Sequence, residues 1–427
     1  MPDDEWQAFA NDPRTKCKYG ENCYQKNPEH HKTYKHPPKT TKAIKDSREK
    51  RRYSPFTRKP KDSETKHHEK NEPGKLGGNK NDEVKSEVSK EFSSSSYAVN
   101  DTSDVESVSV TLPDNLKFYD KNVDQEVFKD LFLVDMPLDF FKFYEFLNKD
   151  SSIEKMLVSA GLQLIGPFDL LLGKLPIVED KDLYLVHWRF FYDPPEFQAI
   201  LKKKGPSQFH IGYYRDSPEE KPVFVASNDS EKGCCITPMA ENIFGAIYLY
   251  LQNEKKKSPF TAMACQKLID KLKKTADEMK YSLEPYSMKK RQTSLIARTL
   301  HGAGIVVPYN KKTQIGYRNL VETDENLKKI FKKIKEASNQ TEKDKAMSEL
   351  QPVITYASIA VDECDFGTGL EAGVDLFCSG LKELQPSALS TLTSVYDLLN
   401  RDAFSKIIRA HLKYRRKGPN LSIVDFK

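Results

Sequence analysis

Apolar and polar residues divide the chain into three zones. From about Leu112 onward, aliphatic and aromatic residues recur at a regular density, which predicts a globular body. From Thr40 to about Ser107 the chain is almost entirely Lys, Glu, Ser, Asn and Asp, and it has too few large apolar side chains to offset the entropy of ordering it. We therefore expect a disordered linker over 39–108. The short segment before it, 14–38, is too small to fold around a hydrophobic core, so it needs a bound metal ion or another cross-link to fold.

The spacing of apolar residues in the body predicts a mixed α and β fold. Residues 137–149 open with a proline and repeat apolar side chains at helical spacing, and 239–280 holds two further helical patterns. Runs rich in aromatic and β-branched residues predict strands at 183–192, 208–214 and 222–227. After an extended stretch at 304–308, the pattern turns helical from about 324 to the C-terminus. The fold class is therefore α+β, with a strand-rich first half and a helical second half.

Composition narrows the classes of partner. The 427 residues are 38% hydrophobic and 30% charged, with a net charge of +6. Residues 1–100 hold 22 basic and 16 acidic side chains, so the remaining residues balance at 46 against 46. This excludes a uniformly basic nucleic-acid-binding body and assigns affinity for polyanions to the N-terminal quarter.

The sequence gives no reason to expect a membrane or secreted protein. The longest apolar run, Ile243–Leu251, is shorter than the roughly 20 residues a spanning helix needs, and the acidic start does not resemble a secretory signal. Seven scattered cysteines favour a reducing compartment, the cytosol or the nucleus. The basic run 48–61 is consistent with a nuclear address or with a solvated linker. We expect Cys234, Cys235, Cys265 and Cys378 to pack as small apolar residues without a further role.

The N-terminal segment contains the residues of a zinc site. Cys17, Cys23, His30 and His36 supply two thiolates and two imidazoles, the donor set of a closed, structural, tetrahedral site. His31 is a surplus histidine, and a basic loop with chance Cys and His is the alternative. The cysteine spacing differs from that of DNA-reading fingers, and prolines 28 and 37 exclude a long recognition helix, so we expect no sequence-specific DNA binding.

This segment resembles the poly(ADP-ribose)-binding zinc finger. The resemblance rests on a series of residues in a fixed order along the segment. They are Arg14, Cys17, Tyr19-Gly20, Cys23-Tyr24, Asn27-Pro28, His30 and His36-Pro37. It implies that Tyr19 and Tyr24 contact adenine and that Arg14 and Lys26 contact the polymer's charged groups. The family has an arginine at the position where this chain has Gln25. Stacking aromatic side chains and clustered cations are the chemistry that a polyanion with bases requires.

A carboxylate motif, DECD at 362–365, is the second informative feature. On a helix over 353–364 the apolar residues, with Cys364 among them, form one stripe; Asp362 points away from it and Glu363 lies on its flank. Gly367 is a plausible helix stop. Acids at a helix C-terminus oppose the macrodipole, which invites a functional explanation, although a solvated charged face is the ordinary alternative.

From about Leu112 to Arg415 the chain resembles the histone PARylation factor family, on the motifs at 166–173, 185–198, 212–225, 301–308, 314–324 and 362–380. The resemblance implies a cofactor for serine ADP-ribosylation, not an enzyme, that completes the active site of nuclear poly(ADP-ribose) polymerases. Glu363 would be the base for the acceptor serine, while Asp362, Arg318 and Tyr317 would contact the polymerase. Partners would be these polymerases, histones and poly(ADP-ribose), on chromosomes at DNA damage. NAD would be the polymerase's substrate, not bound by this chain alone.

The resulting domain assignment is a zinc finger at 14–38, a linker at 39–108 and a body at 109–415, divided into a strand-containing part, 109–280, and a mainly helical part, 281–415. Two alternatives remain open. The chain could be a self-sufficient ADP-ribose hydrolase using Asp362 and Glu363, or a scaffold that only reads poly(ADP-ribose) through its finger. Neither glycine-containing stretch, 301–308 or 367–373, follows a strand and opens a helix as a dinucleotide fingerprint does. This argues against a free-standing transferase.

Overall fold

The computed structural model describes residues 9, 11–17, 28–37, 112–113, 115–121, 123–257 and 259–426. The chain divides into two units, Met1–Tyr97 and Ala98–Lys427. The linker expected over 39–108 lies outside the described residues, as do Tyr19, Cys23, Tyr24 and Lys26 of the finger.

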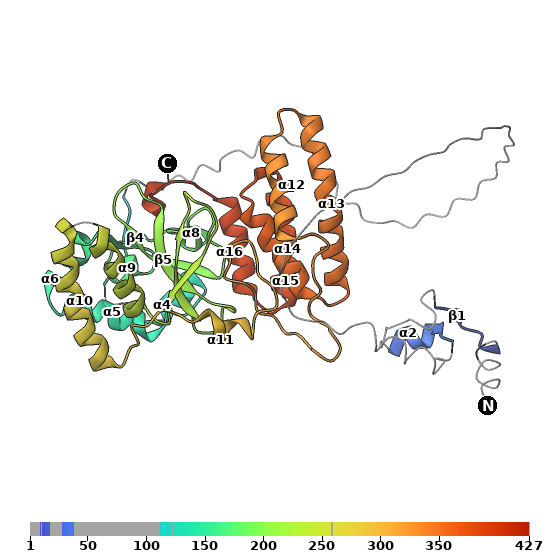
Figure 1. Ribbon diagram of the computed structural model, residues 1–427, viewed down its shortest axis with the longest axis horizontal. Helices are drawn as coiled ribbons and strands as arrows, with labels where there is room; N and C mark the ends of the chain where they lie inside the picture. The colour runs from blue at the N-terminus through green and yellow to red at the C-terminus, as the bar shows by residue number, and fades with distance from the viewer. Residues whose placement is uncertain are drawn as a thin grey trace, which may run out of the picture. The chain divides into compact units, whose positions relative to one another are not determined.

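Among its described residues, the first unit contains a small parallel sheet and the short helix α2 (Figure 1). Strands β1 (Thr15–Lys16) and β2 (Tyr34–Lys35) pair in parallel, with Thr15 opposite Tyr34, and helix α2 (Pro28–Thr33) directly precedes β2. A proline at the first helical position is favourable, since its missing N–H has no intrahelical acceptor there. The described part of this unit therefore contains a six-residue helix and no long one, as its prolines predict.

A five-stranded sheet forms the centre of the first half of the second unit. Neighbouring strands in this sheet are all antiparallel. Their order is β3 (Leu162–Leu164), β4 (Phe197–Lys203), β5 (Phe209–Tyr214), β6 (Phe224–Asp229) and β7 (Thr237–Ala240). Strands β5 and β6 confirm the prediction for 208–214 and 222–227. The register pairs Tyr213 with Val225, both buried.

The strand predicted at 183–192 is wrong. Residues Asp182–Val186 form helix α8, and the chain then turns through Trp188, whose φ is +56°. The run is buried on all sides, so it lacks the alternation of a half-buried strand and cannot be distinguished from a short buried helix by pattern. The carboxylate of Asp169 fixes the turn by accepting hydrogen bonds from the indole of Trp188 at 2.8 Å and, at 2.9 Å, from His187 Nε2.

Helices cover the sheet unit and connect it to the second half. They are α4 (Glu126–Phe132), α5 (Leu138–Asn148), α6 (Ser151–Ser159), α7 (Phe168–Leu171), α9 (Ile243–Lys257), α10 (Pro259–Met279) and α11 (Met288–Gln292). Helices α5, α9 and α10 confirm the helical patterns at 137–149 and 239–280. Figure 1 shows α5, α6, α9 and α10 gathered on the same side of the sheet.

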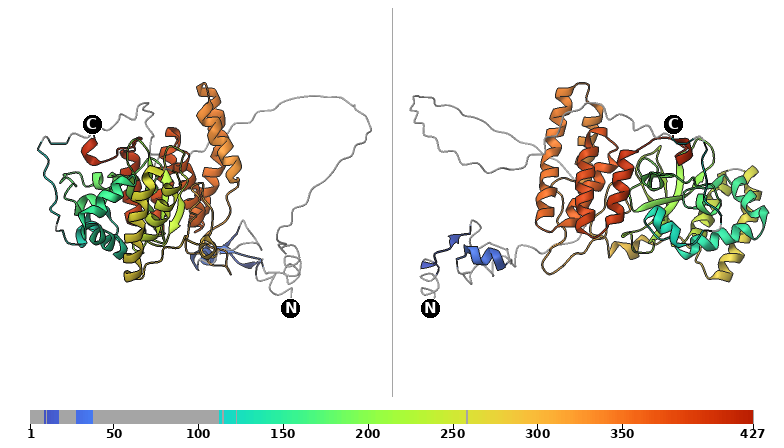
Figure 2. Two further views of the ribbon diagram at one scale, coloured as in Figure 1. Left: turned by 60° about the vertical axis from the view of Figure 1, so that its left-hand side comes forward. Right: turned by 180° about the vertical axis from the view of Figure 1, so that it is seen from behind.

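The second half is an array of helices. Its members are α12 (Asp324–Glu336), α13 (Gln340–Asp362), α14 (Phe366–Cys378), α15 (Gln385–Leu398) and α16 (Asp402–Lys413), with short 3₁₀ turns η2 (Lys382–Leu384) and η3 (Ile423–Asp425). Helix α12 begins where the pattern predicted, capped by the Thr323 side chain. Helix α14 is buried throughout from Gly367 to Cys378, between α13 and α15 (Figure 2). Among the described residues, no helix is both long and apolar enough to cross a membrane.

Candidate functional site

Glu363 lies at the corner between helices α13 and α14. Its backbone N–H donates to the carbonyls of Ile359 and Ala360, both at 3.1 Å, and so closes α13. Cys364 follows with a φ of +69°, a left-handed conformation that non-glycine residues rarely adopt. Asp365 then starts α14, and its N–H returns to the carbonyl of Ala360 at 2.8 Å. The corner therefore displays Glu363 on a tight, hydrogen-bonded turn.

Two details of the predicted helix end are wrong. Cys364 is exposed and is not part of the apolar stripe. Gly367 does not stop a helix but lies in the first turn of α14, because a second helix begins immediately after the corner. A Cβ at Gly367 would lie 2.8 Å from the carbonyl oxygen of Gly316, so the residue is small to allow close approach. Asp365 is consequently at a helix N-terminus, where its charge is favoured by the macrodipole.

Arg318 reaches this corner from the loop before α12. Its Nη1 lies 2.6 Å from Glu363 Oε2, and its Nε lies 3.4 Å from Asp365 Oδ2. The guanidinium carbon stands 5.1 Å from the ring centre of Tyr356, on the last turns of α13. Both Arg318 and Glu363 keep about a third of their side chains exposed, 30% and 32%. The structure thus brings together two residues that are far apart in the sequence.

The other two residues of the predicted interface lie beside this ion pair. Asp362, the last residue of α13, is exposed, as its position opposite the apolar stripe predicts. Tyr317 is half-buried against the core, and its hydroxyl donates to Asn319 Oδ1 at 3.2 Å. Burial, with the nearby carboxylate of Glu371, raises the pKa of Tyr317. Asp362 is therefore open to a partner, whereas Tyr317 also supports the loop.

Two buried carboxyl groups behind the corner were not identified from the sequence. Glu371 and Asp375 lie one turn apart on α14, and one oxygen of each has no hydrogen-bond partner among the described residues. Burial raises the pKa of Glu371 to about 7, and burial raises the pKa of Asp375 as well. Acids four residues apart in an otherwise apolar helix are the signal that would have indicated them.

The prediction that four cysteines pack as small apolar residues is confirmed for three of them and wrong for the fourth. Cys265 and Cys378 are buried and Cys234 is half-buried, as expected of small apolar residues. Cys235 is exposed, so the expectation that it packs in the core is wrong. It follows Cys234 in the turn between β6 and β7, where the backbone is close to solvent.

Three of the four predicted zinc ligands converge in the first unit. The donor atoms of Cys17, His30 and His36 all lie within 4.8 Å of one another. His30 Nε2 is 3.1 Å from His36 Nε2 and 3.6 Å from Cys17 Sγ. Zinc bonds of about 2.0 Å to nitrogen and 2.3 Å to sulfur require donors at such separations. His31 is not a member of this group, and Cys23 lies outside the described residues. The donor set fits zinc.

Arg14, an expected polymer contact, is engaged within the finger. Its guanidinium pairs with the carboxylate of Asp12 at 2.5 Å and also donates to the carbonyl of His31. The guanidinium lowers the pKa of Asp12 to about 2. Arg14 therefore ties the strand β1 region to helix α2, while 44% of its side chain stays exposed.

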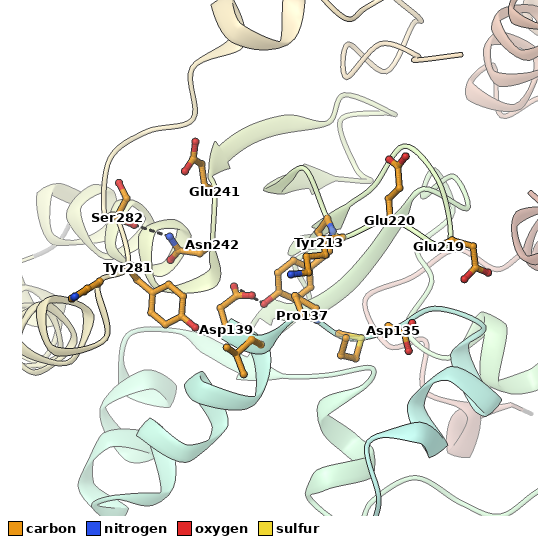
Figure 3. A pocket seen from close by; sticks show the side chains of 15 residues that line it. Asp135, Pro137, Asp139, Tyr213, Glu219, Glu220, Glu241, Asn242, Tyr281 and Ser282 are labelled. Carbon is orange, nitrogen blue, oxygen red and sulfur yellow. Dashed lines mark hydrogen bonds between the residues drawn. The ribbon is translucent and has the colours of Figure 1, made fainter. Parts of the chain in front are cut away.

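A cavity of about 630 Å³ lies in the first half of the body, far in sequence from the corner (Figure 3). Asp139 at its base accepts hydrogen bonds from the hydroxyl of Tyr213 at 2.9 Å and the N–H of Ile243 at 2.8 Å, so it joins α5, β5 and α9. None of Asp362, Glu363 and Arg318 lines this cavity. The ion pair between Arg318 and Glu363 is thus outside this cavity.

Comparison with known proteins covers both parts of the chain. The family model described as histone PARylation factor 1 matches residues 122–415, and the PBZ domain model matches residues 14–39. Histone PARylation factor 1 of Mus musculus is 40% identical over 312 residues, which cover 70% of this chain and 90% of that protein. The Danio rerio protein of the same name is 41% identical over 292 residues, 67% of this chain and 84% of that protein. A putative histone PARylation factor 1-like protein of Homo sapiens is 38% identical over 317 residues, 70% of this chain and 90% of its own length.

Proposed function

The chain belongs to the histone PARylation factor 1 family, and from this premise we propose that it is an accessory factor of poly(ADP-ribose) polymerases. In this proposal it binds a nuclear polymerase and lends Glu363 to the polymerase's active site as the base for an acceptor serine. Histones are the proposed targets, and chromosomes at sites of DNA damage the proposed location.

The observation that carries this proposal is the position of Glu363 on an exposed corner. A carboxylate that acted on a substrate alone would be expected in a concave site that excludes water. Glu363 instead lies at a helix–helix turn, a third exposed, and it does not line the 630 Å³ cavity of Figure 3. A base placed in this way is suited to completing a site that another protein provides. The same observation disfavours a self-sufficient hydrolase based on Asp362 and Glu363.

The proposed chemistry uses one proton transfer by this chain. As the bond between nicotinamide and ribose of NAD breaks, the sugar becomes positively charged and resembles an oxocarbenium ion. The serine oxygen then bonds to the ribose carbon, and its proton passes to the Glu363 carboxylate. Nicotinamide leaves with the bonding electrons. NAD is bound by the polymerase in this account, and this chain supplies the base.

Arg318 is proposed to hold the polymerase and to keep Glu363 oriented before binding. Its guanidinium offers five donors, and 30% of the side chain is exposed. Nη2 is buried and has no hydrogen-bond acceptor among the described residues, so a carboxylate or carbonyl of the polymerase would bind the exposed part of the group and would reach Nη2 only after the side chain moves. Asp362, exposed at the same corner, would meet the same partner, with Tyr317 beside Arg318.

The finger is proposed to hold zinc through Cys17, Cys23, His30 and His36 and to bind poly(ADP-ribose). The match of the PBZ domain model and the convergence of the three described donors support this. Zinc would supply the fold of the segment and no step of the transfer. Tyr19, Tyr24, Arg14 and Lys26 are the proposed polymer contacts, so the factor would stay close to sites that already carry its product.

One reconstitution tests the proposed function. The purified full-length chain is incubated with NAD and a serine-containing histone peptide, with and without a nuclear poly(ADP-ribose) polymerase. We expect serine modification only when both proteins are present. Modification without the polymerase would contradict an accessory role, and polymerase activity on serine that is unaffected by the chain would contradict the proposal altogether.

A further inference from the structure

Thr368 is fully buried in the first turn of α14 and contacts the backbone of Arg318. Its hydroxyl oxygen accepts a hydrogen bond from the Arg318 N–H at 2.9 Å and donates one to the Arg318 carbonyl at 2.7 Å. One side chain thereby satisfies both backbone groups of a residue that lies in a separate loop. Backbone polar groups that are shielded from water need such partners, so this contact fixes where the Arg318 backbone lies.

Two further hydrogen bonds join the same loop to the same helix end. The N–H of Gly316 donates to Asp365 Oδ1 at 2.8 Å, and the N–H of Gly367 donates to the carbonyl of Gly316 at 2.8 Å. The loop is thus held at Gly316 and at Arg318. Asp365 also contacts the Arg318 guanidinium, but Thr368 acts only on the backbone.

We propose that Thr368 is a positioning residue that sets the place of Arg318, and through it the ion pair with Glu363. This inference rests on the proposed function, because it assumes that Arg318 contacts the polymerase. Loss of the hydroxyl would leave the Arg318 N–H and carbonyl without their partner, and the loop would shift to reach water. The guanidinium would then no longer be held at 2.6 Å from Glu363, and the partner would meet it in a less favourable place.

Thr368→Val removes both hydrogen bonds and keeps the size and branching of the side chain. Thr393 offers a matched control, since it is also buried and its hydroxyl donates to the carbonyls of Leu389 and Ser390 within its own helix, α15. Thr393→Val therefore loses a similar buried hydroxyl without touching the Arg318 loop. Thr368→Ser keeps the hydroxyl and should restore the contact.

The experiment measures the affinity of each full-length variant for the polymerase by calorimetry, with the melting temperature as a check of folding. Thr368→Val should weaken binding about tenfold, whereas Thr393→Val and Thr368→Ser should bind like the unmodified chain. In the Arg318→Ala background, Thr368→Val should have no further effect on affinity, because its action passes through Arg318. If valine at 368 prevents folding, Thr368→Ala, which adds no atom to the site, takes its place in every comparison.

The outcomes separate this inference from the proposed function. If Arg318→Ala weakens binding but Thr368→Val does not, the positioning role is wrong and the proposed function stands. If Thr368→Val weakens binding equally with and without Arg318, Thr368 has only a general structural role and the inference is likewise wrong. If Arg318→Ala leaves binding unchanged, the proposed contact of Arg318 fails, and the inference that rests on it fails too.

Discussion

Glu363 and Arg318 form an ion pair with 2.6 Å between Oε2 and Nη1, across the corner where α13 meets α14. The pair is only partly exposed, and Arg318 is also held by Asp365 and lies beside Tyr356. In the free chain this arrangement directs the Glu363 carboxylate toward Arg318. If Glu363 is the base, as we propose, it has to exchange this contact to reach an acceptor serine, so the proposed function links partner binding and delivery of the base through Arg318.

Replacing Arg318 should therefore affect binding more than chemistry. Arg318→Ala removes a guanidinium from an interface and leaves a partner acceptor unpaired, which costs about 2 kcal/mol or more, roughly thirtyfold in affinity. Serine transfer should recover when the variant is added at high concentration. Titration of the polymerase by calorimetry measures the affinity. Arg318→Lys keeps the charge but not the planar guanidinium, so its affinity should lie between those of Arg318→Ala and the unmodified chain. An affinity equal to that of the unmodified chain would refute the interface role.

Glu371 should make the stability of the body depend on pH. Its pKa is raised by burial from 4.5 to about 7, so between these values the folded chain holds a proton that the unfolded chain has released. The free energy of unfolding should then fall as the pH rises from about 5 to 7, by as much as about 3 kcal/mol from this group. Urea unfolding followed by the fluorescence of the buried Trp188 measures it.

Glu371→Gln should flatten this dependence, because glutamine does not titrate. Glu342→Gln is the control: hydrogen bonds from Ser338 lower the pKa of this exposed carboxylate, so its contribution is present at neutral pH and is lost as the pH falls through the lowered pKa. The two substitutions should change opposite ends of the profile. An unchanged slope between pH 5 and 7 in Glu371→Gln would show that Glu371 is not the group responsible.

Loss of a zinc ligand should unfold the finger and leave the body intact. Cys17→Ala removes one of the proposed ligands, and a segment of this size has no core to hold it together without metal. Zinc content and poly(ADP-ribose) binding should both be lost, and Cys23→Ala should behave in the same way. The melting temperature of the body and its support of serine transfer in dilute solution should not change. A variant that still bound poly(ADP-ribose) at full affinity would show that the polymer binds to a part of the chain other than the zinc-bound finger.

Periodicity was sufficient for the helix at 138–148, which has one buried face, and for the return to helix at about 324, where α12 begins. Strands β5 and β6 were predicted from their aromatic and β-branched residues, since β5 is buried along nearly its whole length and does not alternate. Periodicity failed at 183–192, because a run buried on every side has no periodicity to read. The prediction from residue type failed at Gly367, because a glycine can stop a helix or allow another segment to pack closely, and only the position of Gly316 distinguishes the two.

The site was predictable as residue types but not as an arrangement. The motif around Glu363 and the one around Arg318 were recognisable separately, yet their ion pair depends on how the loop packs on α14. Thr368 gave no signal, since its role is a contact with backbone atoms that no sequence pattern encodes. The finger was predicted from its cysteines and histidines together with its resemblance to a known family, and the structure brings three of the four predicted ligands together.

The most direct test of the central claim is the rate of serine ADP-ribosylation supported by Glu363→Gln at a concentration that saturates the polymerase. Glutamine keeps the size of the side chain and an oxygen for Arg318, but it cannot take the proton of serine. We predict a polymerase affinity close to that of the unmodified chain and a rate lower by about two to four orders of magnitude. A rate equal to that of the unmodified chain at saturation would contradict the account, because it would show that Glu363 is not the base.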